Sequence, residues 1–145
     1  MQINNPHSST ISDKGVFRGY AGVFNHLDSQ KDLILPGAFS ESIRTRNVIL
    51  LWQHDYKEPV GKVMHLEENS FGLLVIAQLN LSLSKAKDVH SLIKEKIIGF
   101  LSIGYKCVSY RKHPHNGSRI LQKIDLWEIS IVTFPSNRLS KIIEV

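Results

Sequence analysis

The stretch Leu126-Trp127-Glu128-Ile129-Ser130 places a glutamate inside an apolar run with the pattern of a β-strand. Two earlier stretches share this character. Trp52-Gln53-His54-Asp55 carries a histidine, and Leu101-Ser102-Ile103-Gly104-Tyr105 carries a serine. A serine hydroxyl is a weak nucleophile until an imidazole accepts its proton and a third group orients that imidazole and stabilises its charge. The three stretches therefore contain a base, a nucleophile and an acid for acyl transfer.

Period-two alternation predicts which way these side chains face. In the expected strand 47–54, His54 shares the apolar face of the even-numbered residues. In the expected strand 119–134, Glu128 lies on a face that is otherwise mostly apolar. Burying an unpaired carboxylate is costly, so Glu128 requires a partner, and His54 is the candidate.

Each residue also has an ordinary interpretation. A lone histidine at a strand end is usually a surface residue, and a lone serine in a strand is usually structural. A glutamate late in a sheet commonly pairs with a surface lysine. The joint occurrence of all three in apolar strands favours the catalytic interpretation.

Other kinds of chemistry have weaker support. His113-Pro114-His115, with Cys107 and His54, offers metal ligands, but the two close histidines lie in a turn and no zinc motif is present. Cys107 is better explained as a small buried hydrophobic residue. No glycine-rich phosphate loop and no Gly-x-Ser-x-Gly elbow occurs. We therefore expect no metal and no cofactor, and neither a nucleotide enzyme nor an α/β-hydrolase.

Bulk properties fit one domain spanning 1–145, with 1–14 as a flexible polar tail. Hydrophobic residues make up 42% of the chain, and none of its apolar runs approaches the ~18 residues of a membrane span. One cysteine fits a reducing cytoplasm. The net charge of +5 favours an acidic partner, but the basic residues are scattered, so neither nucleic acid as the main ligand nor a membrane is expected.

The pattern of elements predicts a mainly β protein with helices (α+β). The principal helix is expected over 84–98, with Ser84 as its N-cap, Gly99 as its stop and Ile97 on its buried face. A shorter helix is expected within 38–45. Strands are expected over 16–25, 47–54, 59–66, 73–81, 100–110 and 119–134. This pattern predicts a closed or nearly closed β-barrel with peripheral helices.

The ordered set of motifs resembles the prohead serine proteases of tailed bacteriophages, which are related in fold to assemblin, the herpesvirus maturation protease. The resemblance runs from about Gly19 to Asn137. Its segments are Gly22-Val23-Phe24, Leu33-Ile34-Leu35-Pro36-Gly37-Ala38-Phe39, Leu51-Trp52-Gln53-His54-Asp55, Pro59-Val60-Gly61, Gly72-Leu73, Ser102-Ile103-Gly104-Tyr105 and Leu126-Trp127-Glu128-Ile129-Ser130-Ile131-Val132-Thr133-Phe134-Pro135.

The resemblance implies a herpesvirus-protease-like barrel and a serine endopeptidase. By motif, His54 matches the family's catalytic histidine, Ser102 its nucleophile and Glu128 its acidic position. The implied substrates are the phage major capsid protein and the scaffold protein, with self-cleavage as a further expectation. The implied location is the assembling procapsid in the bacterial host cytoplasm. Self-association is left open.

Two alternatives remain in which the protein is not an enzyme. The chain could be a non-catalytic capsid-assembly or scaffold-binding module of a prophage remnant, or an unrelated β-barrel domain that binds an acidic partner. If it is an enzyme, the oxyanion donors are expected either beside Ser102 or in the turn 111–118.

Overall fold

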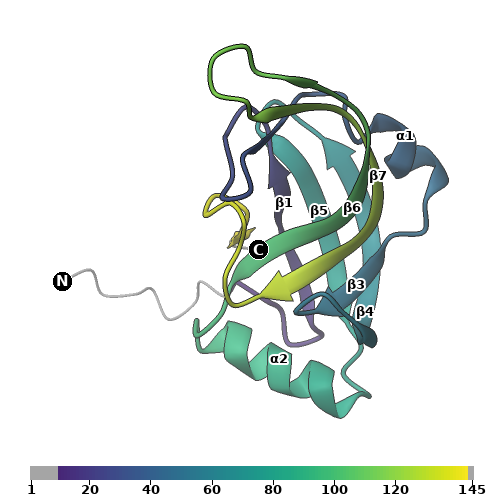
Figure 1. Ribbon diagram of the computed structural model, residues 1–145. Coiled ribbons are helices and arrows are strands. Elements are labelled where there is room, and N and C mark those ends of the chain that lie inside the picture. The colour runs from purple at the N-terminus through teal and green to yellow at the C-terminus, as the bar shows by residue number, and fades with distance from the viewer. Residues whose placement is uncertain (1–9, 144–145) are drawn as a thin grey trace.

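The computed structural model describes residues 10–143, and within them the chain is mainly β. A strongly curled sheet surrounds the core, α2 lies across one end, and the short α1 lies near the opposite end (Figure 1). The strands are β1 Val16–Val23, β2 Asp32–Ile34, β3 Ile49–Trp52, β4 Asp55–Glu68, β5 Gly72–Leu79, β6 Phe100–Lys112, β7 Arg119–Val132 and β8 Ile142–Ile143. The helices are α1 Ser40–Thr45 and α2 Ser84–Lys94.

The sheet is mixed and remains open. Its strand order is β2-β7-β3-β4-β5-β1-β8, with β6 paired to β7 outside this path. Strands β2 and β3 run parallel to β7, whereas β6 is antiparallel to it. Between β1 and β2, the described residues form only the isolated bridge Phe24–Ile34. The predicted closed or nearly closed barrel is therefore not confirmed, and the fold is a curled, half-barrel-like sheet with few helices.

Strand β7 connects the two ends of the molecule. Its first half pairs with β2 and its second half with β3, while β6 follows it along almost its whole length. Residues 128–132 are buried without interruption, as expected of a strand flanked on both edges. The core is apolar apart from a few polar side chains. Its largest fully buried members include Phe17, Phe39, Leu50, Leu73, Leu101, Leu126 and Ile129.

The principal helix is shorter than predicted. It ends at Lys94, and Lys96 follows in the left-handed conformation with φ 58°. The Lys96 N–H donates to the Ile93 carbonyl, and the Ile97 N–H donates to the Leu92 carbonyl, which is a Schellman C-terminal motif. The expected stop at Gly99 is therefore wrong. Ile97, expected on the buried face, is 67% exposed.

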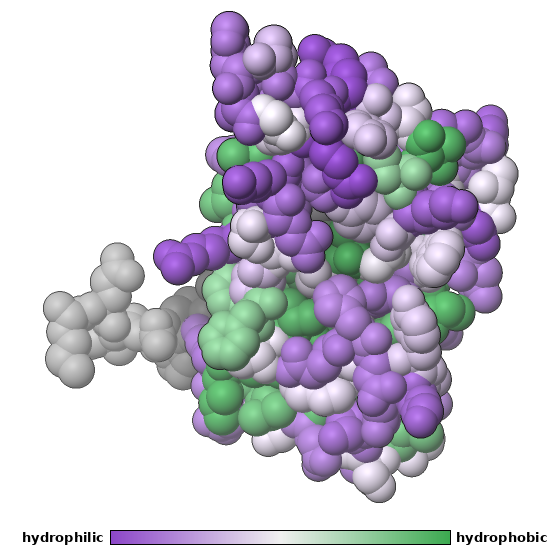
Figure 2. Space-filling model, viewed as in Figure 1, coloured by the Kyte–Doolittle hydropathy of each residue, from purple (hydrophilic) through white to green (hydrophobic). Residues whose placement is uncertain are grey.

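The start of this helix also differs from the expectation. Leu83 occupies the N-cap position without a side-chain hydrogen bond, so Ser84 is the first helical residue rather than the cap. Beyond the other end, the exposed Ile97 contributes to an apolar surface. Figure 2 shows hydrophobic residues gathered where α2 and β7 end, and Phe134 just beyond β7 is 89% exposed.

The N-terminal segment is packed from Ile11 onward. Ile11 is buried in the core, and the Ser12 hydroxyl accepts the Val16 N–H. Residues 1–9, the larger part of the expected flexible tail, lie outside the described residues. No helix in the described part is long and apolar enough to span a membrane.

Candidate active site

His54 lies in a two-residue hairpin turn and not on a strand face as expected. Strand β3 ends at Trp52 and β4 begins at Asp55, and the intervening Gln53 and His54 have φ of 52° and 58°. Two consecutive positive φ angles match the twist of a tight hairpin. The Gln53 N–H donates to the Ile131 carbonyl at 3.0 Å, which fastens the turn to β7.

From this turn the His54 imidazole extends to the carboxylate of Glu128. Glu128 is 3% exposed, and its Oε1 forms a hydrogen bond with Nδ1 of His54. Its Oε2 accepts the Ser130 hydroxyl at 2.6 Å, and that same hydroxyl oxygen accepts the His54 N–H at 3.0 Å. Because the carboxylate is an acceptor, it favours the proton on Nδ1, which leaves Nε2 of His54 free to accept another proton.

A glycine makes room for this carboxylate. Gly104 on β6 is the ladder partner of Glu128 on β7. A Cβ at position 104 would lie 2.8 Å from both Cγ and Cδ of Glu128, closer than side-chain atoms approach. The Glu128 side chain therefore lies over a backbone position that only glycine leaves open.

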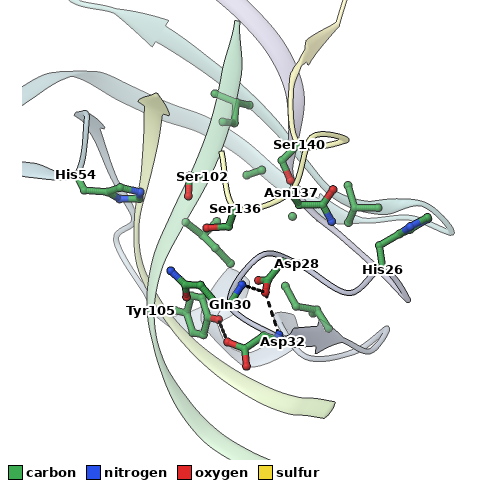
Figure 3. A pocket seen from close by; sticks show the side chains of 16 residues that line it. His26, Asp28, Gln30, Asp32, His54, Ser102, Tyr105, Ser136, Asn137 and Ser140 are labelled. Atoms are coloured by element: carbon green, nitrogen blue, oxygen red, sulfur yellow. Dashed lines mark hydrogen bonds between the residues drawn. The ribbon is translucent and has the colours of Figure 1, made fainter. Parts of the chain in front are cut away.

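Ser102 lies beside this pair. It is the ladder partner of Ser130, and, two residues along, Gly104 is the partner of Glu128. This register places the Ser102 side chain on the same face as Ser130 and Glu128. In Figure 3 the His54 ring points toward Ser102. The structure contains no hydrogen bond between the Ser102 hydroxyl and His54, and both residues line one cavity of about 80 Å³.

The rest of this cavity has both polar and apolar walls. They come from β1, β2, β6, the loop 25–31 and the segment 133–140. The polar lining residues beyond His54 and Ser102 are His26, Asp28, Gln30, Asp32, Tyr105, Ser136, Asn137 and Ser140 (Figure 3). The turn 111–118, one of the two places where oxyanion donors were expected, does not line it.

A second buried carboxylate lies at the far side of the cavity. Asp32 is 2% exposed and accepts two hydrogen bonds from the Arg119 guanidinium, at 2.8 and 2.9 Å, and one from the Tyr105 hydroxyl at 2.9 Å. Burial works against ionisation of Asp32, but the Arg119 and Tyr105 hydrogen bonds outweigh it and lower the pKa of Asp32. Burial, followed by the bond to Asp32, raises the pKa of Tyr105. This cluster is a fixed ion pair.

The structure thus brings together all three predicted site residues and adds others. Ser130 and Asp32 were not among the predicted site residues. Ser130 had a usable signal, because it follows Glu128 by two residues on the same strand face. Asp32 had none, since its partner Arg119 is 87 residues away along the chain. Within residues 10–143 there is no cluster of three His, Cys, Asp or Glu side chains that could hold a metal ion.

Comparisons with known proteins identify a family for this chain. The family model for the caudovirus prohead serine protease matches residues 3–145. The chain is 38% identical over 128 residues to the prohead protease of Enterobacteria phage HK97, covering 86% of this chain and 57% of the relative. It is 30% identical over 133 residues to the prohead protease of Escherichia phage T5, covering 88% of this chain and 62% of the relative. The chain therefore spans less than two thirds of either relative.

Two solved structures share the fold. KSHV protease, bound to a hexapeptide phosphonate inhibitor, matches with a TM-score of 0.63 at 14% identity, covering 90% of this chain and 64% of that one. The bacteriophage T4 capsid assembly protease gp21 matches with a TM-score of 0.64 at 11% identity, covering 83% of this chain and 82% of that one. At these identities the similarity concerns the fold.

Proposed function

Because this chain belongs to the caudovirus prohead serine protease family, we propose that it is a serine endopeptidase of capsid maturation with Ser102 as its nucleophile. His54 is the general base and Glu128 the acid that orients it. The observation that carries the proposal is the hydrogen-bonded arrangement of Glu128 and His54 on the cavity that Ser102 also lines. An oriented imidazole beside a serine hydroxyl is what the attack on an acyl carbon requires, and we propose that His54 and Ser102 form their hydrogen bond when substrate binds.

The reaction proceeds through an acyl-enzyme. The Ser102 Oγ attacks the scissile carbonyl carbon while Nε2 of His54 takes the hydroxyl proton. His54 then gives this proton to the leaving amine, the C–N bond breaks, and the acyl group stays on Ser102. A water molecule then attacks the acyl carbon while His54 takes its proton. The ester bond to Ser102 breaks, the acyl group leaves as a carboxylic acid, and His54 returns the proton to the Ser102 Oγ. Glu128 keeps its negative charge throughout and stabilises the imidazolium.

We assign the oxyanion donors to the backbone of Ser136 and Asn137. Both residues line the cavity, and within the described part of the chain neither backbone N–H donates to another protein group. The Ser136 carbonyl accepts the Ser29 N–H at 2.9 Å, which fixes this segment against the loop 25–31. Free N–H groups on a fixed segment are the preorganised donors that a tetrahedral intermediate needs.

The proposed substrates are the major capsid protein and the scaffold protein, cleaved inside the assembling procapsid in the bacterial host cytoplasm, together with sites on the protease itself. Two relatives are named prohead proteases, and the T4 structural neighbour is a capsid assembly protease. The competing function is a non-catalytic assembly module that binds capsid or scaffold protein without cutting it.

The test is co-expression with the neighbouring capsid and scaffold proteins, followed by intact-mass analysis of every product. We expect defined truncations with the wild type and none with Ser102→Ala. Ser109→Ala is the matched control, because Ser109 is exposed on the same strand far from the cavity. Uncut proteins in shells assembled by both wild type and Ser102→Ala would support the assembly module instead.

A further inference from the structure

The cavity that holds Ser102 contains a carboxylate for which the proposed mechanism has no use. Asp28, in the loop between β1 and β2, is half-buried and lines this cavity (Figure 3). Its Oδ1 accepts the N–H groups of Gln30 and Asp32, each at 2.9 Å. Its Oδ2 has no hydrogen-bond partner among the described residues. One oxygen thus fixes the carboxylate, and the other is available to a ligand.

The loop around Asp28 is rigidly held. The Asp28 N–H donates to the Asp32 carbonyl at 2.9 Å, and the Lys31 N–H donates to the Asp28 carbonyl at 3.1 Å. The Ser29 N–H bonds to Ser136, on the segment that also lines the cavity. A carboxylate held by its own loop binds a ligand without first losing conformational freedom.

Asp28 forms no ion pair with another described residue. The charge of Arg119 favours ionised Asp28 at a distance, but its guanidinium is committed to Asp32 through two hydrogen bonds. Among the described residues that line the cavity there is neither lysine nor arginine, although the whole chain carries a net charge of +5. Burial raises the pKa of Asp28, and its backbone hydrogen bonds offset this only in part. A cation placed beside Asp28 would remove this penalty.

We propose that Asp28 is the specificity residue of this cleft and binds the cationic side chain of a substrate lysine or arginine close to the scissile bond. The inference rests on the proposed function, since it assigns a substrate class to the same cavity. Lysine and arginine donate charge-assisted hydrogen bonds to a carboxylate, and a buried carboxylate left unpaired by the wrong substrate disfavours that substrate.

The first measurement locates the bonds that the wild type cuts in co-expressed capsid and scaffold proteins. We expect a lysine or arginine at one fixed position relative to these bonds. A peptide spanning such a bond is then compared with two analogues, carrying the other basic residue or methionine at that position. For the wild type, methionine should lower kcat/KM roughly 10- to 100-fold, as expected for loss of a hydrogen bond to a charged group.

The variant Asp28→Asn completes the test. Asparagine retains the Oδ1 acceptor that holds the loop and removes only the charge. It should lower kcat/KM for the basic peptides by a similar factor and have little effect on the methionine peptide. Asp88→Asn, on the exposed face of α2, is the matched control and should leave both rates unchanged.

Labelling of Ser102 by a fluorophosphonate separates the two proposals. A wild type that neither labels nor cuts contradicts the proposed function itself. Normal labelling and cutting, with equal rates for the lysine, arginine and methionine peptides, overturns the role of Asp28 alone. The peptide comparison uses only the wild type, so it decides the question even if Asp28→Asn does not fold.

Discussion

Two buried carboxylates lie at opposite ends of the β7 ladder, and they differ in their partners. Glu128, 3% exposed, bonds to the His54 imidazole and the Ser130 hydroxyl. Asp32, 2% exposed, bonds to the Arg119 guanidinium and the Tyr105 hydroxyl. A guanidinium is always charged, whereas an imidazole gains and loses a proton near neutral pH. Asp32 is thus suited to hold strands together, and Glu128 to support proton transfer.

Among the variants that test this comparison of the two carboxylates, Glu128→Gln should have the largest effect on activity. An amide cannot stabilise the imidazolium and favours the wrong tautomer of His54, so kcat/KM should fall about 10²- to 10⁴-fold. Thermal melting should change far less, because the side-chain shape is kept. Peptide hydrolysis and a melting curve measure both effects. If Glu128→Gln is as active as the wild type, Glu128 has no part in the mechanism. The two carboxylates would then not differ in function.

Arg119→Met should act on stability instead. It leaves Asp32 buried without its counter-ion. The cost should be about 2–3 kcal/mol of unfolding free energy, less than the about 3–5 kcal/mol of a fully buried pair, because the Arg119 side chain is 40% exposed. Urea denaturation measures this loss. Arg111→Met, at an exposed position on β6, is the control and should cost little. Combining Arg119→Met with Asp32→Asn should restore part of the stability.

Acid titration tests the same ion pair. The folded-state pKa of Asp32 lies below its ordinary value of 3.8, so ionised Asp32 stabilises the fold above that value. This contribution is lost as pH falls through the folded-state pKa. Stability of the wild type, followed by denaturation between about pH 5 and pH 2, should therefore fall more steeply than that of Asp32→Asn. If the stability of the two proteins changes in parallel with pH, the ion pair with Arg119 does not stabilise ionised Asp32.

Gly104→Ala should lower activity by disturbing the contact between Glu128 and His54, without affecting the ion pair of Asp32. The added methyl would displace the carboxylate from His54, and a displacement of about 1 Å costs on the order of 100-fold in kcat/KM. Gly99→Ala provides the control, since a Cβ there meets nothing within 4 Å. Unchanged activity in Gly104→Ala would mean that the Glu128 side chain has another productive position.

Ser130→Ala should have the smallest effect. It removes one donor to Glu128 and the acceptor of the His54 N–H, each worth about 1 kcal/mol. We expect a fall of about tenfold in kcat/KM, because the Glu128 carboxylate and the His54 backbone would each lose a hydrogen bond. A purely structural serine would lower stability and leave kcat/KM unchanged. Ser109→Ala serves again as the control.

Much of the fold follows from local patterns. Alternation along residues 73–81 and 119–134 predicted β5 and β7 to within two residues at each end, and the apolar spacing from Ala86 to Ile93 predicted α2. The end of α2 was missed because Lys96, an ordinary helix former, adopts the left-handed conformation typical of glycine at that position. Closure of the sheet also has no local signal, since it depends on pairing between distant strands.

The site was predicted through motif order more than through geometry. Ser102 and Glu128 were expected on strands and lie there, whereas His54 was expected on a strand face and lies in a turn. The resemblance to prohead proteases is confirmed by the family match. Asp28 and Asp32 carry no sequence signal, because an acidic residue in a polar loop is usually a solvated one. Only their three-dimensional neighbours show otherwise.

The left-handed turn at Gln53 and His54 has a consequence for how this protein can change. A tight hairpin with two positive φ angles is most stable with asparagine and glycine, and other residues each cost up to about 1–2 kcal/mol there. Selection for stability alone would therefore replace His54 with glycine and abolish the proposed base. If His54 is the base, the turn is a trade-off between stability and activity, because a backbone conformation that costs stability carries the side chain that the proposed reaction needs.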